Sequence, residues 1–370
     1  MSEETLHIPD EPIPASLLTG FLGSGKTTLL RALLSDPAME ETAVVINEFG
    51  EIGLDHHLVA ESSEDMVLMN SGCLCCSIRG DLVDTLRGLY KKRVRGEVPP
   101  FTRLVIETTG LADPAPILHT LMTDPVLMER FRLDGVITTV DAVNGEATLD
   151  AQMESVKQAA VADRILVTKG DLAKPEALEA LEARLKALNP AAPLLRIENG
   201  RVAPERLFGC GLYDPKTKSL DVQRWLAAEA YEGDHHGQGP GHDHGHDHEQ
   251  GHDHHHHDVN RHDERVRAFC VTYETPLDWD RLNAWVEMLI TLYGGQILRI
   301  KGILNIEGEE LPLVVHGVQH LFHPPVQLPA WPDEDRTTRL VFIVRDLPQS
   351  LFEETLRSFN EDSAPGLTQA

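Results

Sequence analysis

Residues 20–27 read Gly20-Phe21-Leu22-Gly23-Ser24-Gly25-Lys26-Thr27, and this stretch decides the fold. A short apolar run, Ala15 to Leu18, precedes it and is typical of a buried strand, while leucines at helical spacing continue the chain to Leu34. Strand, glycine-rich turn and helix are the context in which a G-x-x-x-x-G-K-T sequence cradles phosphate. The sequence therefore predicts a P-loop nucleotide-binding domain, with a purely structural glycine-rich turn as the alternative.

The residues of this loop have separate expected roles. The glycines let successive backbone N–H groups face one anion, and the helix N-terminus adds partial positive charge. Lys26 is expected to lie on the β- and γ-phosphates, and the Thr27 hydroxyl is the expected Mg²⁺ ligand. The predicted phosphate-binding residues are Gly20, Gly23, Ser24, Gly25, Lys26, Thr27 and Thr28.

A second apolar strand, beginning at Arg164, ends in Thr168-Lys169-Gly170-Asp171. In an open α/β sheet, ligands bind at the carboxyl ends of the strands. The Asp171 carboxylate can accept two hydrogen bonds from the N1–H and amino groups of guanine, a donor pair that adenine lacks. The stem of Lys169 is expected to lie across the base. Thr168, Lys169 and Asp171 therefore favour GTP, although a helix-capping turn is the alternative.

A third strand runs from Arg103 and ends in Glu107-Thr108-Thr109-Gly110. Glu107 is expected to hold the Mg²⁺ shell or to orient the attacking water, and the Gly110 N–H to sense the γ-phosphate. Lys26, Thr27 and Glu107 are thus the predicted catalytic residues.

Three cysteines lie close together, at Cys73, Cys75 and Cys76. Thiolates favour Zn²⁺ and similar ions over Mg²⁺ or Ca²⁺. In an extended segment Cys73 and Cys75 would point to one face and Cys76 to the other, so a tetrahedral site needs a turn or an outside ligand. The candidates nearby in sequence are Glu51, Asp55, His56 and His57. Small core residues are the alternative interpretation of the cysteines.

Taken together, five motifs resemble the CobW family of metal-associated P-loop GTPases, which is related to HypB and UreG, and within it the YjiA branch. The motifs are residues 20–27, 47–51, 72–76, 107–114 and 168–171, and residues 298–304 and 317–320 are similar to the carboxy-terminal domain of that family. One departure concerns a metal ligand. The YjiA branch carries a glutamate before Asn-Glu-Phe-Gly, whereas this chain has Ile46, so any ligand at that place is absent.

The resemblance implies a slow GTPase that acts as a metallochaperone, with GTP and Mg²⁺ at the P-loop and Zn²⁺ as the expected cargo. Co²⁺ and Ni²⁺ are the alternative ions. Glu51, Cys73, Cys75 and Cys76 are the expected cargo ligands, with Thr27 as the Mg²⁺ ligand. If the loop of Glu51 also responds to the γ-phosphate, nucleotide state and metal affinity become coupled. The alternatives are a cobalt or iron insertase and a histidine-rich zinc buffer with regulatory GTP binding.

Between Gly233 and His262 the composition changes to His, Asp and Gly, and twelve of the nineteen histidines fall there. Such a stretch cannot bury an apolar core and is expected to be a disordered linker. Imidazole suits Zn²⁺, Ni²⁺, Cu²⁺ and Co²⁺, so we interpret the stretch as a weak reservoir that passes ions to the thiolates. A solvated linker without a metal role is the alternative.

Composition narrows the class of protein. No apolar run reaches the roughly 20 residues of a membrane helix, the first residues carry no secretory signal, and the five cysteines do not suggest a disulfide framework. The formal charge of −26 disfavours nucleic acid as a partner. These features predict a cytoplasmic protein without membrane or nucleic-acid contacts. The expected partner is a client metalloprotein, and a homo-oligomer is compatible with the sequence.

The motif positions predict a tail at 1–14, a P-loop GTPase domain at 15–228, the His-rich linker at 229–263 and a carboxy-terminal domain at 264–370. The GTPase domain is expected to be α/β with a doubly wound, mostly parallel sheet. Its further strand candidates are Val44 to Ile46, Val67 to Met69, Leu104 to Ile106, Val136 to Val140 and Ile165 to Val167. Asp141, which follows Val140, is expected either to reach the phosphates or to cap the next helix.

The carboxy-terminal residues predict a smaller α+β domain, with helices on one face of its sheet. The expected strands are 266–273, 297–306, 313–316 and 340–344, and the expected helices are 279–293 and 351–359. His316, His320 and His323 lie within eight residues and are candidates for a second metal site, although such histidines are more often surface or interface residues. This domain is expected to recognise a client or to close over the nucleotide.

Overall fold

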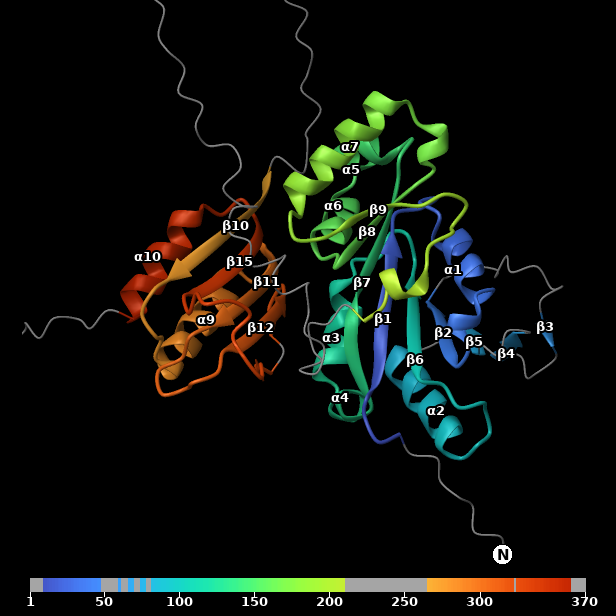
Figure 1. Cartoon of the computed structure of the whole chain (residues 1–370), viewed down its shortest axis with the longest axis horizontal. Helices are drawn as coiled ribbons and strands as arrows, with labels where there is room; N and C mark the ends of the chain where they lie inside the picture. Colours follow the sequence, from blue (N-terminus) through green and yellow to red (C-terminus); the bar gives the residue numbers. More distant parts are fainter. Residues whose placement is uncertain are drawn as a thin grey trace, which may run out of the picture.

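The computed structural model describes residues 9–47, 59–60, 66–69, 74–77, 81–209, 265–322 and 324–360. These residues form two sheets, each with its own helices (Figure 1). The predicted fold class is confirmed: a mostly parallel, doubly wound α/β sheet is followed by a smaller antiparallel α+β sheet. The segment boundaries near residues 14, 228 and 263 stay predictions, and the last two fall in residues 210–264, which lie outside the described part.

The strands of the first sheet lie in the order β3-β4-β5-β2-β6-β1-β7-β8-β9. Every neighbouring pair from β5 to β9 is parallel, whereas β3 and β4 join the β5 edge antiparallel. The strands are β1 (Ile13–Gly20), β2 (Thr42–Asn47), β3 (Val59–Ala60), β4 (Met66–Met69), β5 (Leu74–Ser77), β6 (Arg103–Thr108), β7 (Phe131–Asp141), β8 (Arg164–Thr168) and β9 (Leu194–Arg196). The parallel arrangement brings the carboxyl ends of β1, β6, β7 and β8 to one edge.

Helices cover both faces of this sheet. The helices are α1 (Lys26–Leu34), α2 (Leu82–Val94), α3 (Ala115–Thr123), α4 (Pro125–Arg130), α5 (Gly145–Ala151), α6 (Met153–Ala160) and α7 (Pro175–Leu188). Leu17 and Leu18 are consecutive in β1, and both are buried. Leu17 packs in one cluster with residues of α2 and α3, while Leu18 packs in another with residues of α1. Because successive strand residues point to opposite faces, the sheet is doubly wound.

The second sheet has the order β10-β15-β11-β12-β13, with β14 paired to β12, and its pairs are antiparallel. Its elements are β10 (Val266–Tyr273), α9 (Trp279–Tyr293), β11 (Ile297–Leu304), β12 (Leu313–Val318), β13 (Leu321–Phe322), β14 (Val326–Gln327), β15 (Thr338–Arg345) and α10 (Gln349–Asn360). The prediction of a strand to Ile306 is too long by two residues, because Ile306 leaves β11 and forms an isolated bridge with Leu277. Trp285, Phe342 and Phe352 lie in the core between this sheet and its helices.

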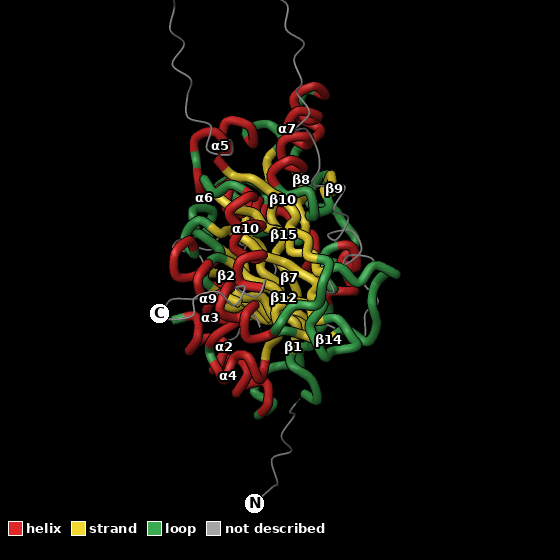
Figure 2. Tube along the Cα trace, turned by 90° about the vertical axis from the view of Figure 1, so that its left-hand side faces the viewer, coloured by secondary structure: helices red, strands yellow, loops and turns green. Residues whose placement is uncertain are grey.

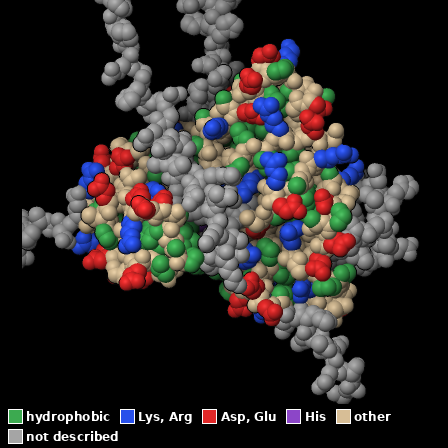
Figure 3. Space-filling view, in the orientation of Figure 1, with side chains coloured by type: hydrophobic (Ala, Val, Ile, Leu, Met, Phe, Trp, Pro, Cys, Tyr) green, Lys and Arg blue, Asp and Glu red, His purple; other side chains and the backbone are tan. Residues whose placement is uncertain are grey.

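The other face of the second sheet packs against the first domain (Figures 1 and 2). Leu298 and Ile343 share a core cluster with residues of α6 and α7, and Val318 and Leu321 of the β12–β13 hairpin join the cluster that contains α3. Figure 3 shows acidic and basic side chains interspersed over the visible face of both domains. Within the described ranges, none of the helices is long and apolar enough to cross a membrane.

Candidate functional site

The phosphate loop connects β1, which ends at Gly20, to α1, which begins at Lys26. Gly23 and Gly25 have φ values of 72° and 94°, in the left-handed region that favours glycine. The Ser24 N–H donates to the Phe21 carbonyl at 3.1 Å and closes the turn. The predicted strand, turn and helix are therefore all present, in the geometry that anion-binding loops require.

Two neighbouring strands hold this loop in place. A Cβ atom on Gly20 would overlap the backbone oxygen and Oγ1 of Thr139 in β7, so glycine is required there. The hydroxyls of Ser24 and Thr139 lie 2.7 Å apart, and Thr168 Oγ1 in β8 donates to the Ser24 carbonyl at 2.8 Å. Thr168, expected at the base, thus also anchors the loop, and Thr139 is a loop contact that the sequence motifs did not reveal.

The predicted catalytic side chains converge at the end of β1 and β6. Lys26 is buried, and its Nζ donates to the carbonyls of Gly20 at 2.8 Å and Phe21 at 3.2 Å. Thr27 Oγ1 donates to Oε1 of Glu107 at 3.4 Å, and Glu107 is only 3% exposed. Two hard oxygens meeting beside the loop are the donor chemistry that Mg²⁺ takes, so these residues fit that ion. Thr28 is exposed at the start of α1.

The segment after β6 lies directly against the phosphate loop. A Cβ on Gly110 would be 2.5 Å from the Leu22 backbone nitrogen, so the two backbones touch. Gln158 of α6 is buried, and its Nε2 donates to the carbonyls of Gly110 at 3.1 Å and Ala112 at 3.0 Å. Asp113 pairs with Lys157 of α6 at 2.7 Å. Contact with the loop agrees with a γ-phosphate sensor at Gly110, which stays a prediction, and sequence reasoning missed the support from α6.

The expected guanine-binding residues follow β8. Lys169 takes a left-handed φ of 55°, and its Nζ lies 2.7 Å from Oδ2 of Asp141 at the end of β7. Asp171 is exposed in the short 3-10 turn that follows. The structure therefore gives Lys169 an ion pair that the sequence did not predict, while the base contacts of Lys169 and Asp171 remain predictions.

Asp141 caps the turn that leads into α5. Its Oδ1 accepts a hydrogen bond from the Val143 N–H at 2.8 Å, and its Oδ2 accepts one from Asn144 Nδ2 at 3.0 Å. Burial opposes ionisation, but these hydrogen bonds and that of Lys169 outweigh it, so the pKa of Asp141 lies below its ordinary value. Asp141 thus stabilises the turn before α5 and does not cap the helix itself, whose N-cap residue is Asn144. The lowered pKa keeps the carboxylate ionised to complement Lys169.

Of the expected cargo ligands, Cys75 and Cys76 lie in β5, whereas Cys73 and Glu51 lie outside the described residues. Asp55, His56 and His57 lie outside them as well. The register pairs Ser77 of β5 with Ile46 of β2, and Ile46 in turn with Glu107 of β6. Because neighbouring strands are about 4.8 Å apart, the cysteine strand is about 10 Å from the strand of Glu107. The thiol motif and the nucleotide motif therefore share one stretch of sheet.

The two described histidines of the proposed second metal site, His316 and His320, lie in different surroundings. His316 is buried in β12 beside the charges of Asp163, whereas His320 is exposed in the β12–β13 turn and faces His119 of α3. His323 lies outside the described residues. Among those that the structure describes, no three His, Cys, Asp or Glu side chains are grouped closely enough to hold a metal.

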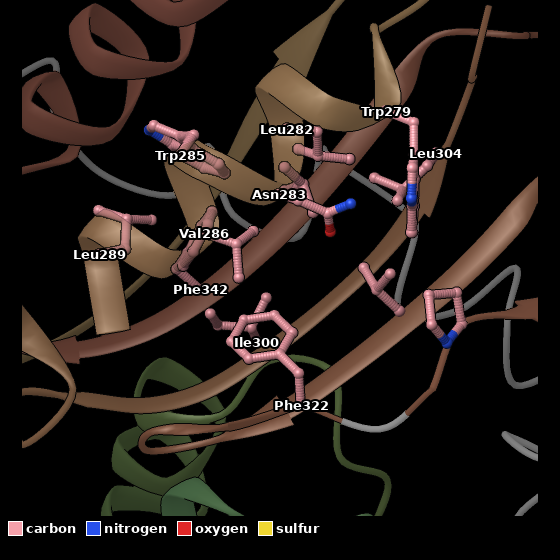
Figure 4. Close-up of a pocket in the computed structure, with 13 residues that line it drawn as sticks. Trp279, Leu282, Asn283, Trp285, Val286, Leu289, Ile300, Leu304, Phe322 and Phe342 are labelled. Carbon is pink, nitrogen blue, oxygen red and sulfur yellow. The ribbon is translucent and has the colours of Figure 1, made fainter. Parts of the chain in front are cut away.

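A separate cavity of about 110 Å³ lies between α9 and the second sheet. Figure 4 shows Trp285, Val286 and Phe342 around it, with the amide of Asn283 among mostly apolar neighbours. All of its lining residues belong to the carboxy-terminal domain, so this cavity is distinct from the nucleotide site.

Comparison with known proteins gives this geometry a family context. Residues 14–196 match the family described as CobW/HypB/UreG, nucleotide-binding domain, and residues 266–360 match the cobalamin synthesis protein cobW C-terminal domain. The chain is 33% identical to the zinc chaperone YjiA of Escherichia coli over 91% of this chain and 96% of YjiA. It is 31% identical to the zinc chaperone CobW of Pseudomonas aeruginosa, over 94% and 91% of the two chains. The crystal structure of Zn(II)-bound YjiA GTPase superimposes with a TM-score of 0.70 at 30% identity, covering 95% of this chain and 100% of that one.

Proposed function

The chain belongs to the CobW family of P-loop GTPases, and from this premise we propose that it delivers Zn²⁺ to a client metalloprotein under control of its nucleotide state. It is a GTPase and a zinc metallochaperone of this family. The observation that carries the finer proposal is the register of β5, β2 and β6. It puts the strand of Cys75 and Cys76 two positions across the sheet from Glu107.

The proposed GTPase site uses side chains already in place. Lys26 neutralises the phosphates, and the N–H of Gly110, a residue whose backbone lies against the loop, contacts the γ-phosphate. Thr27 and Glu107 hold Mg²⁺, which neutralises charge on the phosphate oxygens when it is bound. Asp171 distinguishes guanine from adenine. Turnover is expected to be slow until a partner completes the catalytic set, as is common for switch GTPases.

Coupling between nucleotide and cargo follows from the shared strand β2. Its last residue, Asn47, leads into the segment that carries Glu51, and its two neighbours are β5 with the cysteines and β6 with Glu107. A change at the γ-phosphate that moves this segment would alter the ligands available to Zn²⁺. By linkage, Zn²⁺ would alter nucleotide affinity by the same factor.

The test is Zn²⁺ affinity by chelator competition on protein lacking residues 234–262, with a Mg²⁺-bound non-hydrolysable GTP analogue or with GDP. We expect the two affinities to differ at least tenfold, about 1.4 kcal/mol, and the difference to vanish in a Cys75→Ser/Cys76→Ser variant. Equal affinities in the two nucleotide states would overturn gating.

The twelve histidines between Gly233 and His262 favour one second candidate, a zinc buffer in which GTP binding is regulatory. Deleting residues 234–262 separates the two functions. A buffer would lose most of its zinc capacity and its role, whereas a chaperone would keep GTP-dependent transfer to an acceptor protein at reduced capacity.

A further inference from the structure

Two histidines from different domains face each other at the surface. His119 lies on the exposed rim of α3, and His320 lies in the two-residue turn between β12 and β13. Their ring centroids are 6.0 Å apart, with planes inclined by 52°. Nothing in the sequence pattern links these positions, which are about two hundred residues apart in the chain.

The backbone around both rings is held in place. Val318 and Leu321, on either side of the turn, are buried in the same cluster as Leu118, the neighbour of His119. Gln319 takes a left-handed φ of 54°, and its Nε2 donates to Asp113 Oδ2 at 3.3 Å. The two histidines therefore lie at the rim of a packed contact, where main-chain motion is limited.

The chemistry and spacing suit a shared cation. Two imidazoles on one tetrahedral ion, with Zn–N bonds of about 2.1 Å, place their centroids about 5 Å apart, and the observed 6.0 Å is about 1 Å longer, so the rings would have to approach each other on binding. Thr123 Oγ1 lies 3.3 Å from His119 Nδ1. The Thr123 hydroxyl donates to the His119 carbonyl at 2.9 Å, so its oxygen can accept from an Nδ1–H. In that tautomer Nε2 carries the lone pair that a metal would take, as in metal sites where a second hydrogen bond fixes the ring.

We propose that His119 and His320 form a binding site for a borderline divalent cation, Zn²⁺ being the expected one, with water in the remaining positions. The ion bridges the GTPase domain and the carboxy-terminal domain. This site goes beyond the proposed delivery function and does not depend on it, because it contains none of the cysteines. With two protein ligands, its affinity is expected to be micromolar or weaker, well below that of a four-ligand site.

A bound ion would also stiffen the contact with the phosphate-facing segment. Asp113, three residues after Gly110, is joined to the carboxy-terminal domain through Gln319 and to α6 through Lys157. The bridge would lie on the same turn as Gln319 and on the helix that follows Asp113. Metal occupancy there is therefore positioned to hold the two domains together beside the nucleotide site.

The test is hydrogen exchange followed by mass spectrometry on the full chain, with and without micromolar Zn²⁺, in a Cys75→Ser/Cys76→Ser background. We expect Zn²⁺ to slow exchange at least threefold in peptides covering residues 115–123 and 313–322. His119→Ala or His320→Asn should each abolish this protection. Thr120→Ala, on the same helix, removes no ligand and should retain it.

The double replacement His119→Cys with His320→Cys distinguishes loss of ligands from local damage, since it restores two zinc ligands and should restore protection. Unchanged thermal midpoints without metal would show that the single variants fold. Protection that persists in both histidine variants, or that is absent from the parent, would overturn the bridge. Neither result would bear on zinc gating at the cysteine strand.

Discussion

At the residue scale, the hydroxyl of Thr27 is the most exacting requirement of the proposed Mg²⁺ site. It contacts Glu107 at 3.4 Å, and replacement of Thr27 by alanine removes this oxygen from a side chain that is not part of the buried core. We expect Thr27→Ala to lower the GTP hydrolysis rate at least tenfold, about 1.4 kcal/mol, measured as phosphate release across a Mg²⁺ titration. Thr27→Ser keeps the oxygen and should keep most activity. Equal rates for alanine and wild type would remove Thr27 from the site.

Gly110 offers a steric prediction. An added Cβ would lie 2.5 Å from the nitrogen and 2.7 Å from the Cα of Leu22, so the phosphate loop must shift. We expect Gly110→Ala to destabilise the protein by about 1–3 kcal/mol and to weaken GTP binding, measured by denaturation and by titration with a fluorescent GTP analogue. Gly88→Ala is the matched control. An added Cβ on Gly88 in α2 would meet no atom within 4 Å beyond its own stretch of helix, so the variant should gain about 0.5–1 kcal/mol of stability.

Sequence reasoning at this scale found the residues that act within one contiguous motif. Lys26 and Thr27 were recognisable because the loop, its strand and its helix are adjacent in the chain. Thr139 was not, because its contact with Ser24 depends on the register of β7 beside β1, with 115 residues between the two hydroxyls. Such contacts have no local pattern.

At the scale of elements, α6 supports the segment that faces the phosphates. Gln158→Leu keeps a similar volume but removes the hydrogen bonds to the carbonyls of Gly110 and Ala112, so about 1–3 kcal/mol of stability should be lost. We also expect Gln158→Leu to weaken the binding of a GTP analogue more than the binding of GDP, when each affinity is compared with that of wild type. Asn189→Ala is the control, because its Nδ2 donates to three carbonyls around the end of α6, away from the loop. Asn189→Ala should lower stability without changing nucleotide affinity. An equal loss of affinity for the GTP analogue in Asn189→Ala would refute the specific role of Gln158.

Elements with clear ends were predicted best. The helix Trp279–Tyr293 agrees with its prediction, because the Asp278 side chain accepts from the Arg281 N–H at its start and Gly294 follows its end. β5 is not among the predicted strands: the cysteine motif at residues 73–76 indicates metal ligands, whereas Leu74–Ser77 forms a sheet strand between β2 and β4. Cysteines in a four-residue run carry no strand periodicity, so only the sheet partners reveal it.

At the scale of the whole molecule, a buried ion cluster joins the two domains. Asp163, which immediately precedes β8, accepts hydrogen bonds from Arg299 Nη2 at 2.5 Å and Lys301 Nζ at 2.7 Å of β11, and from the Val136 N–H at 2.9 Å. The acid and its two cations are separated by more than 130 residues, so sequence patterns could not pair them. The cluster fixes how β11 sits on the GTPase domain.

Replacement of Asp163 tests whether this cluster stabilises the assembly of domains. Burial opposes its ionisation, but the charges of Arg299 and Lys301 outweigh that effect and hold the pKa of Asp163 well below its ordinary value. Asp163→Asn leaves two buried cations without their counter-charge, so we expect a loss of about 3–5 kcal/mol at pH 7, measured by urea denaturation. Asp346→Asn, at an exposed pair with Arg265, should cost about 1 kcal/mol or less.

The pH dependence of the stability difference between wild type and Asp163→Asn distinguishes a loss of ion pairs from a loss of packing. Because the folded pKa of Asp163 lies below the unfolded one, its contribution is fully present above about pH 4 and is lost as the pH falls further toward the folded value. The difference in unfolding free energy between wild type and Asp163→Asn should therefore shrink as the pH falls below about 4. If that difference in unfolding free energy does not shrink down to pH 3, the charge of Asp163 makes no contribution. The loss in Asp163→Asn would then be assigned to packing and not to the ion pairs with Arg299 and Lys301.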